Sequence, residues 1–354
     1  MEAQAKRLIL GYNFDMTTKI AINGFGRIGR AALKIAMEKK DVEIVAINDL
    51  TDTKTLAHLL KYDTNYGLYE KEVSYDGSNL VIEGKSIPVF AEKDPTKLPW
   101  GEIGVDVVLE CTGFFTTTEK ANAHIAAGAK KVVVSAPTES EDMDTILFGV
   151  NEDKLSDQNI ISNGSCTTNC ITPIAAVVEE NFGIEKAMMT TVHALTATQN
   201  LTDSPCKDLR RARAAGYNIV PTSTGAAKAT IQALPSLTGK FDGLSIRIPI
   251  PVVSMADFSI VTKKDVTKEE INSIFKQAAQ NPLYQGIITV TEEPAVSSDF
   301  IGDPHSAIID LELTNVVAGN LIKVVAWYDN EWGYSNRLVE QAIMIGMKAN
   351  PSSV

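Results

Sequence analysis

The stretch Lys19–Arg30 reads KIAINGFGRIGR, and it decides the fold of the first half of the chain. An apolar predicted strand, Lys19–Asn23, runs directly into Gly24, Gly26 and Gly29, which have the spacing GxGxxG. The first glycine allows a tight turn, the second lets the backbone approach a pyrophosphate, and the third lets helix and strand pack closely. The helix that follows offers unpaired N–H groups and a positive dipole end. The stretch therefore predicts a dinucleotide-binding turn.

An acidic residue stands at the distance that this motif requires. Asp49 ends a second predicted strand, about 20 residues after the last glycine. A carboxylate at this place accepts hydrogen bonds from the adenosine ribose hydroxyls and repels a 2′-phosphate. The sequence thus favours NAD over NADP as the cofactor, with the alternative that Asp49 only caps the following loop.

Strands and helices alternate along the first half of the chain. Such alternation predicts βαβ units and a parallel sheet, and strands that are apolar almost throughout predict a sheet covered on both faces. The expected strands after the motif are Val42–Asn48, Val105–Glu110 and Lys131–Ser135, and the expected helices are Arg27–Lys40, Thr53–Tyr62 and Thr117–Ala127.

The second half has longer strand-like runs and a different organisation. A helix over Cys166–Asn181 and a long loop over Asn200–Tyr217 accompany these runs. The pattern predicts an α+β domain with a mixed or mainly antiparallel sheet and helices on one side. The expected strands are Ala187–Ala194, Leu244–Pro251, Asp257–Lys263, Ile308–Leu313 and Leu321–Tyr328.

We therefore expect an α/β protein with a Rossmann-type NAD-binding domain over residues 18–165 and a catalytic domain over residues 166–334. A C-terminal helical stretch within residues 335–354 is expected to pack back on the first domain. Residues 1–17 form an N-terminal extension, whose first 15 residues are interpreted as a disordered segment or as the result of an upstream start codon before Met16.

Composition excludes several classes of function. The chain has 354 residues and a formal net charge of -11, which disfavours nucleic acids and anionic membranes as partners. No apolar run approaches the ~18 residues that span a bilayer. The four cysteines make no disulfide framework and no CxxC pair, so we expect no metal site and a reducing, cytoplasmic compartment.

The densest motif is SNGSCTTNC, at Ser162–Cys170. Ser165 is a good N-cap, which places Cys166 in the first turn of a helix. Helix N-terminal N–H groups stabilise a thiolate and lower its pKa from roughly 8.5. Cys166 is therefore the predicted nucleophile toward an aldehyde, whereas Cys170, one turn later, is expected to be a buried structural thiol.

Among the four histidines, His193 has the position of a catalytic base, because it ends an apolar strand, where α/β domains place functional groups. His58 and His124 lie in helical patterns and are expected to be partly exposed, and His305 lies in a predicted turn. A lone histidine is more often structural, but pairing with Cys166 favours a functional role. His193 would hold the thiolate and take a hydroxyl proton as hydride leaves.

These motifs resemble those of the glyceraldehyde-3-phosphate dehydrogenase family, from about Thr18 to the C-terminus. The resemblance implies NAD-dependent, phosphorylating oxidation of glyceraldehyde 3-phosphate to 1,3-bisphosphoglycerate through a cysteine thiohemiacetal and thioester, in a homotetramer. The matching stretches are Ile22–Arg30, Ser162–Cys170, Thr191–Gln199, Arg210–Ala229 and Trp327–Arg337.

The resemblance also implies roles for further residues. The cofactor would contact Arg27, Ile28, Lys93, Ser135 and, through its nicotinamide carboxamide, Asn330. The substrate phosphate would bind Thr196 and Arg247, and inorganic phosphate would bind Ser165, Thr167, Thr224 and Gly225, with Arg210 assisting. Hydroxyls, a backbone N–H and a guanidinium are suitable anion ligands.

Structural alternatives remain for four of these residues. Thr224 and Gly225 are also consistent with a simple turn before a helix, and Thr196 with a satisfied strand end. Arg247 lies in an apolar strand, where an unpaired charge is costly to bury. An anionic ligand or a structural carboxylate would each meet that cost.

Two rival functions are consistent with parts of the sequence. The first is erythrose-4-phosphate dehydrogenase, a close relative, which the stretches Ser298–Ile309 and Asp329–Gly333 also resemble. Against it, Thr196–Gln199 and Thr222–Ala227 keep the family's pattern of two phosphate sites. A non-enzymatic binding protein built on the nucleotide fold is the rival from another class. The negative net charge and the lack of a basic stretch interleaved with aromatic residues argue against nucleic acid as its ligand.

Overall fold

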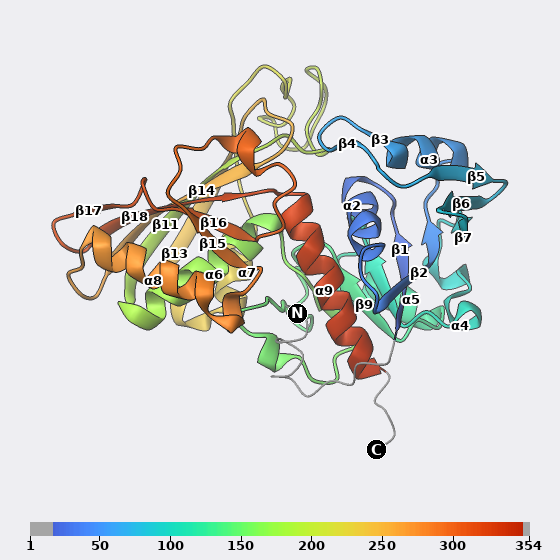
Figure 1. Cartoon of the computed structure of the whole chain (residues 1–354), viewed down its shortest axis with the longest axis horizontal. Coiled ribbons are helices and arrows are strands. Elements are labelled where there is room, and N and C mark those ends of the chain that lie inside the picture. The colour runs from blue at the N-terminus through green and yellow to red at the C-terminus, as the bar shows by residue number, and fades with distance from the viewer. Residues whose placement is uncertain (1–16, 350–354) are drawn as a thin grey trace. The chain divides into compact units, whose positions relative to one another are not determined.

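The structure is a computed structural model that describes residues 17–349 (Figure 1). The first 16 residues of the expected N-terminal extension and the last five residues of the C-terminal segment lie outside the described residues. Two compact units divide the described chain. The parallel-sheet unit comprises residues 17–146, Asp153–Gly164 and residues 335–349, and the mixed-sheet unit comprises Leu147–Glu152 and Ser165–Tyr334.

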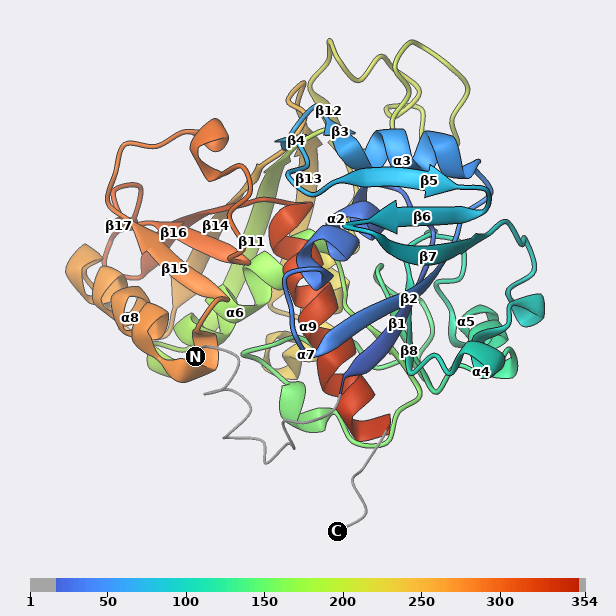
Figure 2. The ribbon, with the colours of Figure 1, turned by 45° about the vertical axis from the view of Figure 1, so that its right-hand side comes forward.

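The parallel-sheet unit is built on one eight-stranded sheet in the order β10-β9-β8-β1-β2-β7-β6-β5. Its strands are β10 (Ile160–Ser162), β9 (Lys131–Val134), β8 (Val107–Glu110), β1 (Thr18–Asn23), β2 (Val42–Asn48), β7 (Lys85–Phe90), β6 (Asn79–Ile82) and β5 (Val73–Asp76). The strands from β10 to β7 pair in parallel. Strand β6 pairs antiparallel with β7, and β5 pairs antiparallel with β6 (Figure 2). Every residue of β8 and β9 is buried, as expected for a sheet covered on both faces.

The helices of this unit follow the predicted alternation. They are α2 (Arg27–Ala36), α3 (Thr53–Lys61), α4 (Trp100–Ile103), α5 (Thr118–Ala126) and, from residue 335 onward, α9 (Trp332–Ala349); a two-stranded hairpin joins β3 (Tyr62–Asp63) and β4 (Gly67–Leu68). Helix α9 packs on the sheet so closely that a Cβ on Gly346 would overlap the side chain of Thr18. Helix α2 is shorter than the predicted Arg27–Lys40, because the chain must turn before β2 begins at Val42.

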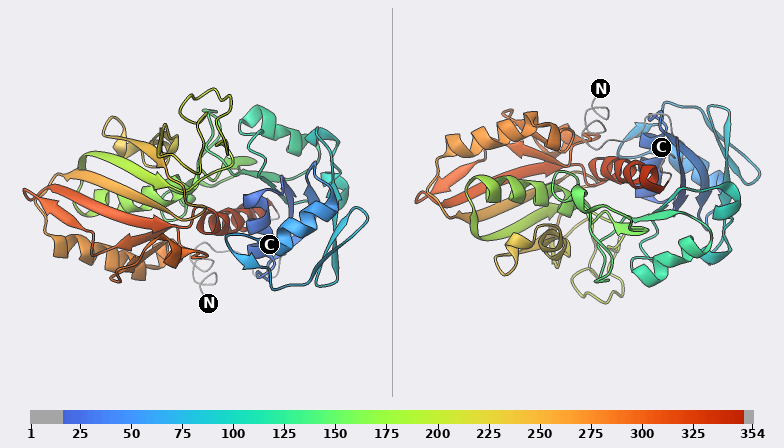
Figure 3. Two further views of the ribbon diagram at one scale, coloured as in Figure 1. Left: turned by 90° about the horizontal axis from the view of Figure 1, so that it is seen from above. Right: turned by 90° about the horizontal axis from the view of Figure 1, so that it is seen from below.

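The mixed-sheet unit carries a second sheet, in the order β12-β13-β11-β14-β18-β16-β15. Its strands are β12 (Val220–Thr222), β13 (Phe241–Arg247), β11 (Ile184–His193), β14 (Ser254–Thr262), β18 (Leu321–Tyr328), β16 (Ala307–Asp310) and β15 (Ile288–Thr291), with β17 (Asn315–Val317) paired to β18. Strand β11 is parallel to β13 and antiparallel to β14. Helices α6 (Cys166–Asn181), α7 (Ala226–Ala233) and α8 (Lys268–Gln280) pack together on one face of the sheet (Figure 3).

The expected fold class, a parallel-sheet dinucleotide-binding domain with a second α+β domain, is confirmed. Among the predicted strands, β13 differs most from its expected bounds: it begins at Phe241 and ends at Arg247, whereas the prediction is Leu244–Pro251. Pro249 and Pro251 have no N–H to donate to a ladder, which explains the early end. Short 3₁₀ helices lie at Pro95–Lys97, Glu152–Lys154, Pro235–Leu237, Pro282–Tyr284 and Ser297–Phe300.

Candidate active site

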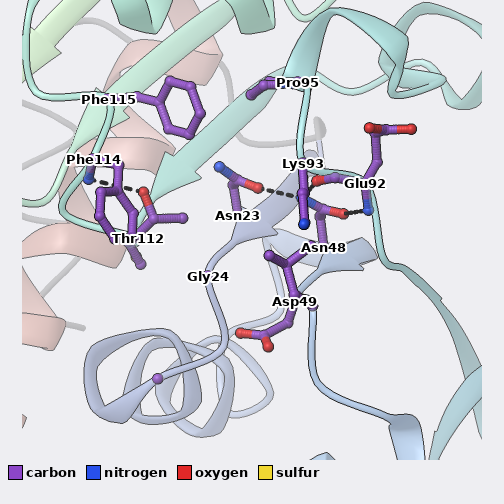
Figure 4. A pocket seen from close by; sticks show the side chains of 13 residues that line it. Asn23, Gly24, Asn48, Asp49, Glu92, Lys93, Pro95, Thr112, Phe114 and Phe115 are labelled. Atoms are coloured by element: carbon purple, nitrogen blue, oxygen red, sulfur yellow. Dashed lines mark hydrogen bonds between the residues drawn. The ribbon is translucent and has the colours of Figure 1, made fainter.

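The carboxyl ends of β1, β2 and β8 open onto a pocket of about 480 Å³ (Figure 4). Parallel sheets bind ligands at this edge. Four of the predicted cofactor residues, Gly24, Gly26, Asp49 and Lys93, line the pocket. Its other lining residues are Asn23, Asn48, Leu50, Glu92, Pro95, Cys111, Thr112, Phe114 and Phe115.

Each of the three glycines meets a different steric requirement. Gly24 has a φ of +93°, and a Cβ there would lie 2.8 Å from the carbonyl carbon of Cys111. A Cβ on Gly29 would overlap the carbonyl oxygen of Gly24, so this position holds the helix against the turn. A Cβ on Gly26 would meet nothing within 4 Å and would project into open space. The fold itself does not require a glycine at position 26, but the missing side chain leaves space for a ligand.

The first turn of α2 is suited to an anion. Its N-cap is Gly26, and no side chain in the described part of the chain caps it. Arg27 and Ile28 are the first helical residues, so their backbone N–H groups lie at the positive end of the helix dipole, where anions bind. The guanidinium of Arg27 lies 2.7 Å from a carboxylate oxygen of Asp63 and 5.6 Å from the ring centre of Tyr66. The Arg27 side chain thus lies against Asp63 and Tyr66, and its backbone N–H is the group at the start of the helix.

Asp49 joins the glycine turn to the loop after β2, which it caps. Its Oδ2 accepts a hydrogen bond from Phe25 N (2.7 Å), which ties it to the glycine turn. Its Oδ1 accepts one from Thr51 N (2.9 Å), which caps the loop after β2. The carboxylate is thereby held at the pocket wall, where it can accept further bonds from hydroxyl groups.

Sequence reasoning missed the polar floor of this pocket. Asn48 Nδ2 donates to Asn23 Oδ1 (2.7 Å), and Glu92 N donates to Asn48 Oδ1 (2.9 Å) (Figure 4). Beyond β8, Thr112 accepts a hydrogen bond from Phe114 N (3.0 Å). Asn23 and Asn48 are the last residues of adjacent parallel strands. That position was the available signal for them.

The mixed-sheet unit brings the predicted nucleophile and base together. Ser165 caps α6 by accepting from Thr168 N (3.0 Å), in a reciprocal capping box, and Cys166 is the first residue of the helix. The Cys166 Sγ lies 3.4 Å from His193 Nε2. Cys170 is fully buried, as expected for a structural thiol.

Burial and charge act on this pair in opposing ways. Burial raises the pKa of the Cys166 thiol, while Arg247 and hydrogen bonds from Thr167 lower it. Burial, and then the positive charge of Arg247, lower the pKa of His193 to about 3, against the effect of the Ala194 carbonyl. The pair in the free protein is therefore a thiol beside a neutral imidazole.

Arg247 lies opposite His193 in the register of β13 and β11. Its Nη1 contacts His193 Nδ1 and lies 3.3 Å from the carbonyl oxygen of Ala194. Within residues 17–349 no carboxylate forms an ion pair with Arg247, and burial lowers the pKa of its guanidinium. The alternative of a structural carboxylate partner thus finds no support in the described chain.

The remaining anion-site candidates have local partners. Thr167 Oγ1 and Thr191 Oγ1 lie 2.9 and 2.7 Å from the buried hydroxyl of Tyr328. Thr196 follows β11, with its Oγ1 2.8 Å from Thr198 Oγ1. Thr224 Oγ1 accepts from Ala226 N (3.2 Å), and Gly225 is the N-cap of α7. The turn before a helix is thus present, and it leaves the role in anion binding open.

Arg210 is exposed, and its backbone N–H donates to Asp208 (2.9 Å). Its neighbour Arg211 instead reaches inward: Nε donates to Thr222 Oγ1 (2.8 Å), and its charge acts on Arg247. Sequence reasoning missed Arg211, because nothing local distinguishes two adjacent arginines in an irregular loop.

Three predicted cofactor residues complete the placement. Ser135 follows β9 and donates its N–H to the Glu110 carbonyl (2.9 Å), and Lys93 is exposed at the pocket. Asn330 follows β18 in the other unit, where its Oδ1 accepts from Ser254 Oγ (2.9 Å). The described residues contain no cluster of three or more His, Cys, Asp or Glu side chains that could hold a metal ion. Between residues 17 and 349, no helix is long and apolar enough to cross a membrane.

A glycine-rich turn at the edge of a parallel sheet, and a cysteine–histidine pair at a helix start, define a dinucleotide-dependent oxidoreductase. The family model described as glyceraldehyde 3-phosphate dehydrogenase, NAD binding domain, matches residues 18–118, and the one described as its C-terminal domain matches residues 165–330. The chain therefore belongs to the glyceraldehyde 3-phosphate dehydrogenase family.

Curated relatives agree over nearly their whole length. The chain is 53% identical over 334 residues to glyceraldehyde-3-phosphate dehydrogenase 2 of Streptomyces avermitilis, and 53% identical over 335 residues to glyceraldehyde-3-phosphate dehydrogenase of Geobacillus stearothermophilus. It is 52% identical over 335 residues to glyceraldehyde-3-phosphate dehydrogenase 1 of Bacillus subtilis. Each match covers 94% of this chain and 99% of the relative.

Proposed function

We propose that this protein oxidises D-glyceraldehyde 3-phosphate to 1,3-bisphosphoglycerate, with NAD as the cofactor and inorganic phosphate as the second substrate. The observation that carries the proposal is the 3.4 Å approach of Cys166 Sγ, at the start of α6, to His193 Nε2. Membership of the family supports the choice of substrate and cofactor.

The pocket at the edge of the parallel sheet fits NAD. Gly26 leaves open space beside an uncapped helix start, where a pyrophosphate has room, and the Asp49 carboxylate suits ribose hydroxyls. Arg27 and Ile28 would donate backbone N–H groups, with Lys93 and Ser135 as further contacts. Asn330 would bind the nicotinamide carboxamide. When bound, NAD supplies the hydride acceptor.

Cys166 and His193 carry the chemistry in this proposal. His193 Nε2 takes the thiol proton as Sγ attacks the aldehyde carbon, and it returns that proton to the resulting alkoxide of the thiohemiacetal. It then takes the hydroxyl proton as hydride leaves the same carbon, which forms a thioester on Cys166. A phosphate oxygen attacks the thioester carbonyl, and the sulfur leaves as a thiolate.

Two groups of residues would bind the phosphates. Arg247 and Thr196 would hold the substrate phosphate, whose negative charge would compensate the buried guanidinium. Ser165, Thr167, Thr224 and Gly225 would hold inorganic phosphate. For the assisting arginine, the contacts of Arg211 with Thr222 support it over the exposed Arg210.

The test follows NADH formation from glyceraldehyde 3-phosphate, with and without inorganic phosphate, in the wild type and in Cys166→Ser. Turnover should require phosphate and vanish in Cys166→Ser, while NAD binding to that variant stays intact. Fast turnover without phosphate would contradict the phosphate site. Faster turnover on erythrose 4-phosphate than on glyceraldehyde 3-phosphate would favour the rival enzyme.

Gly26→Ala tests the cofactor pocket separately from the fold. The added Cβ meets no protein atom within 4 Å, so the melting temperature should not change. The Kd for NAD should rise about tenfold or more, because the methyl group occupies cofactor space. Gly29→Ala is the contrasting variant, since its Cβ overlaps Gly24 and should destabilise the unit itself. An unchanged Kd in Gly26→Ala would mean that NAD binds elsewhere.

We also propose a homotetramer in the cytoplasm. Large apolar side chains are exposed on the loop that precedes β12, which supports burial in an assembly; they are Leu201, Leu209, Tyr217 and Ile219. The four free thiols support a reducing compartment. Sedimentation analysis should give four times the chain mass, and a monomer would contradict the assembly.

A further inference from the structure

One buried hydroxyl joins Asn330 to the residue after the proposed base. Ser254 begins β14 and lies beside Tyr328 in the register of β14 and β18. Its side chain is 1% exposed. Its Oγ accepts a hydrogen bond from Ala194 N (3.1 Å) and donates one to Asn330 Oδ1 (2.9 Å). Neither bond is part of the sheet ladder, so the hydroxyl has a task that packing alone does not explain.

The direction of these bonds fixes the Asn330 amide. A backbone N–H can only donate, so Ser254 Oγ accepts from Ala194 and keeps its own hydrogen for Asn330 Oδ1. The amide of Asn330 must then turn its Nδ2 away from Ser254. The backbone is already anchored next door, because the Asp329 carboxylate accepts from Gly302 N (2.9 Å) and Trp332 N (2.8 Å). With the neighbouring backbone anchored, the remaining variable at Asn330 is the orientation of its side-chain amide.

We propose that Ser254 is a positioning residue that selects this orientation, so that Asn330 presents Nδ2 as a donor to the carboxamide oxygen of the nicotinamide ring. The inference rests on the proposed function of Asn330 as the nicotinamide contact. The same hydroxyl holds Ala194, whose neighbour His193 is the proposed base. Ser254 therefore sets the face of the ring that receives the hydride without touching either substrate.

The decisive variant is Ser254→Ala, with Ser245→Ala as its matched control. Ser245 lies on β13 and is equally buried, and its Oγ has no hydrogen-bond partner among residues 17–349, so the control removes the same atom without breaking a bond there. Ser254→Ala should lower kcat about tenfold and change the KM for NAD less than about threefold, because the adenosine half binds elsewhere. Ser254→Thr keeps the hydroxyl and should restore kcat. If Ser254→Ala folds poorly, Ser254→Cys, a weak donor of similar size, gives the same comparison.

The stereochemistry of hydride transfer is a readout that a purely structural role would not move. With substrate deuterated at the aldehyde carbon, the wild type and Ser245→Ala should place deuterium on one C4 position of NADH, as seen by NMR. Ser254→Ala should place a measurable fraction on the other. Single-sided transfer with kcat equal to that of Ser245→Ala would overturn the inference.

Asn330→Asp separates this inference from the proposed function. The aspartate keeps an acceptor for Ser254 but removes the Nδ2 donor. Wild-type turnover and stereochemistry in Asn330→Asp would refute the nicotinamide contact itself. An impaired Asn330→Asp beside a normal Ser254→Ala would refute only the role of Ser254.

Discussion

Two buried histidines, one in each unit, have opposite surroundings. His124 on α5 is 0% exposed, although its helical pattern predicted partial exposure, which was wrong. Trp100 Nε1 donates to its Nδ1 (3.1 Å), and its Nε2 lies 3.0 Å from Glu110 Oε2. An indole N–H only donates, so Nδ1 must accept, and the ring proton sits on Nε2, facing the carboxylate. One protonation state therefore satisfies Trp100 and Glu110 together, and Asn23 Nδ2, which lies 3.4 Å from Nε2, donates to Glu110 instead (2.5 Å).

His193 has no such state. Its Nδ1 lies 2.8 Å from the Ala194 carbonyl, which needs a donor, and it also contacts the Arg247 guanidinium, which needs an acceptor. Its Nε2 faces the Cys166 thiol. The partners of His124 are complementary, whereas the Ala194 carbonyl and the Arg247 guanidinium compete for Nδ1 of His193. The difference separates the two residues more sharply than burial does.

The largest effect should come from breaking the complementary set. Glu110 accepts from Asn23 Nδ2 (2.5 Å), His124 Nε2, Thr112 N (2.8 Å) and Thr112 Oγ1. Glu110→Ala removes the acceptor of the buried donors on Asn23 and His124 and of the half-buried Thr112, and it should lower the free energy of unfolding by about 3–5 kcal/mol in urea titrations.

The control for this variant is Glu43→Ala. Glu43 forms an exposed ion pair with Lys85 (2.8 Å), and its loss should cost about 0–1 kcal/mol. Similar losses in the two variants would show that the His124 network is not the stabilising set described above.

The competing partners of His193 predict a smaller change in the free energy of unfolding, and this change depends on pH. Burial and then Arg247 lower the pKa of His193 from 6.5 to about 3, so the folded protein binds fewer protons than the unfolded chain below the ordinary value. Stability is therefore lost as pH falls through about 6.5 toward about 3, by about 2 kcal/mol between pH 7 and pH 5. His193→Gln has no such group, so its free energy of unfolding should fall by about 2 kcal/mol less over that interval. If the wild type and His193→Gln lost the same free energy of unfolding between pH 7 and pH 5, His193 would be protonated in the folded protein.

The sequence predicted what local chemistry determines. Helix α6 spans Cys166–Asn181 as expected, because Ser165 supplies its cap within the motif itself. The glycine turn and Asp49 also lie where spacing placed them, since the strand, turn and helix are contiguous.

What escaped prediction depends on residues far apart in the chain. Trp100 and Glu110 meet His124 only in the fold. The short strands β5 and β6 have no long apolar run that would predict them. Arg211 differs from Arg210 only by which of them turns inward in an irregular loop. The role of Ser254 depends on its hydrogen bonds to Ala194 and Asn330, which lie far from it in the sequence.

The smallest effect should come from Thr112→Val, which removes one member of the His124 network at the pocket wall. The variant keeps the shape of the side chain but loses the hydroxyl that donates to Glu110 Oε1 and accepts from Phe114 N (3.0 Å). Thr112 N still donates to Glu110 (2.8 Å), so the carboxylate keeps a partner. The free energy of unfolding should therefore fall by only about 1 kcal/mol.

Because Thr112 and Phe114 line the pocket, the Kd for NAD should rise about fivefold in calorimetric titrations, while kcat at saturating NAD stays at the wild-type value. Binding and chemistry would then be governed by different units, as the two histidines suggest. A fall in kcat with an unchanged Kd would instead tie the complementary network to the reaction and remove the distinction between the two histidines.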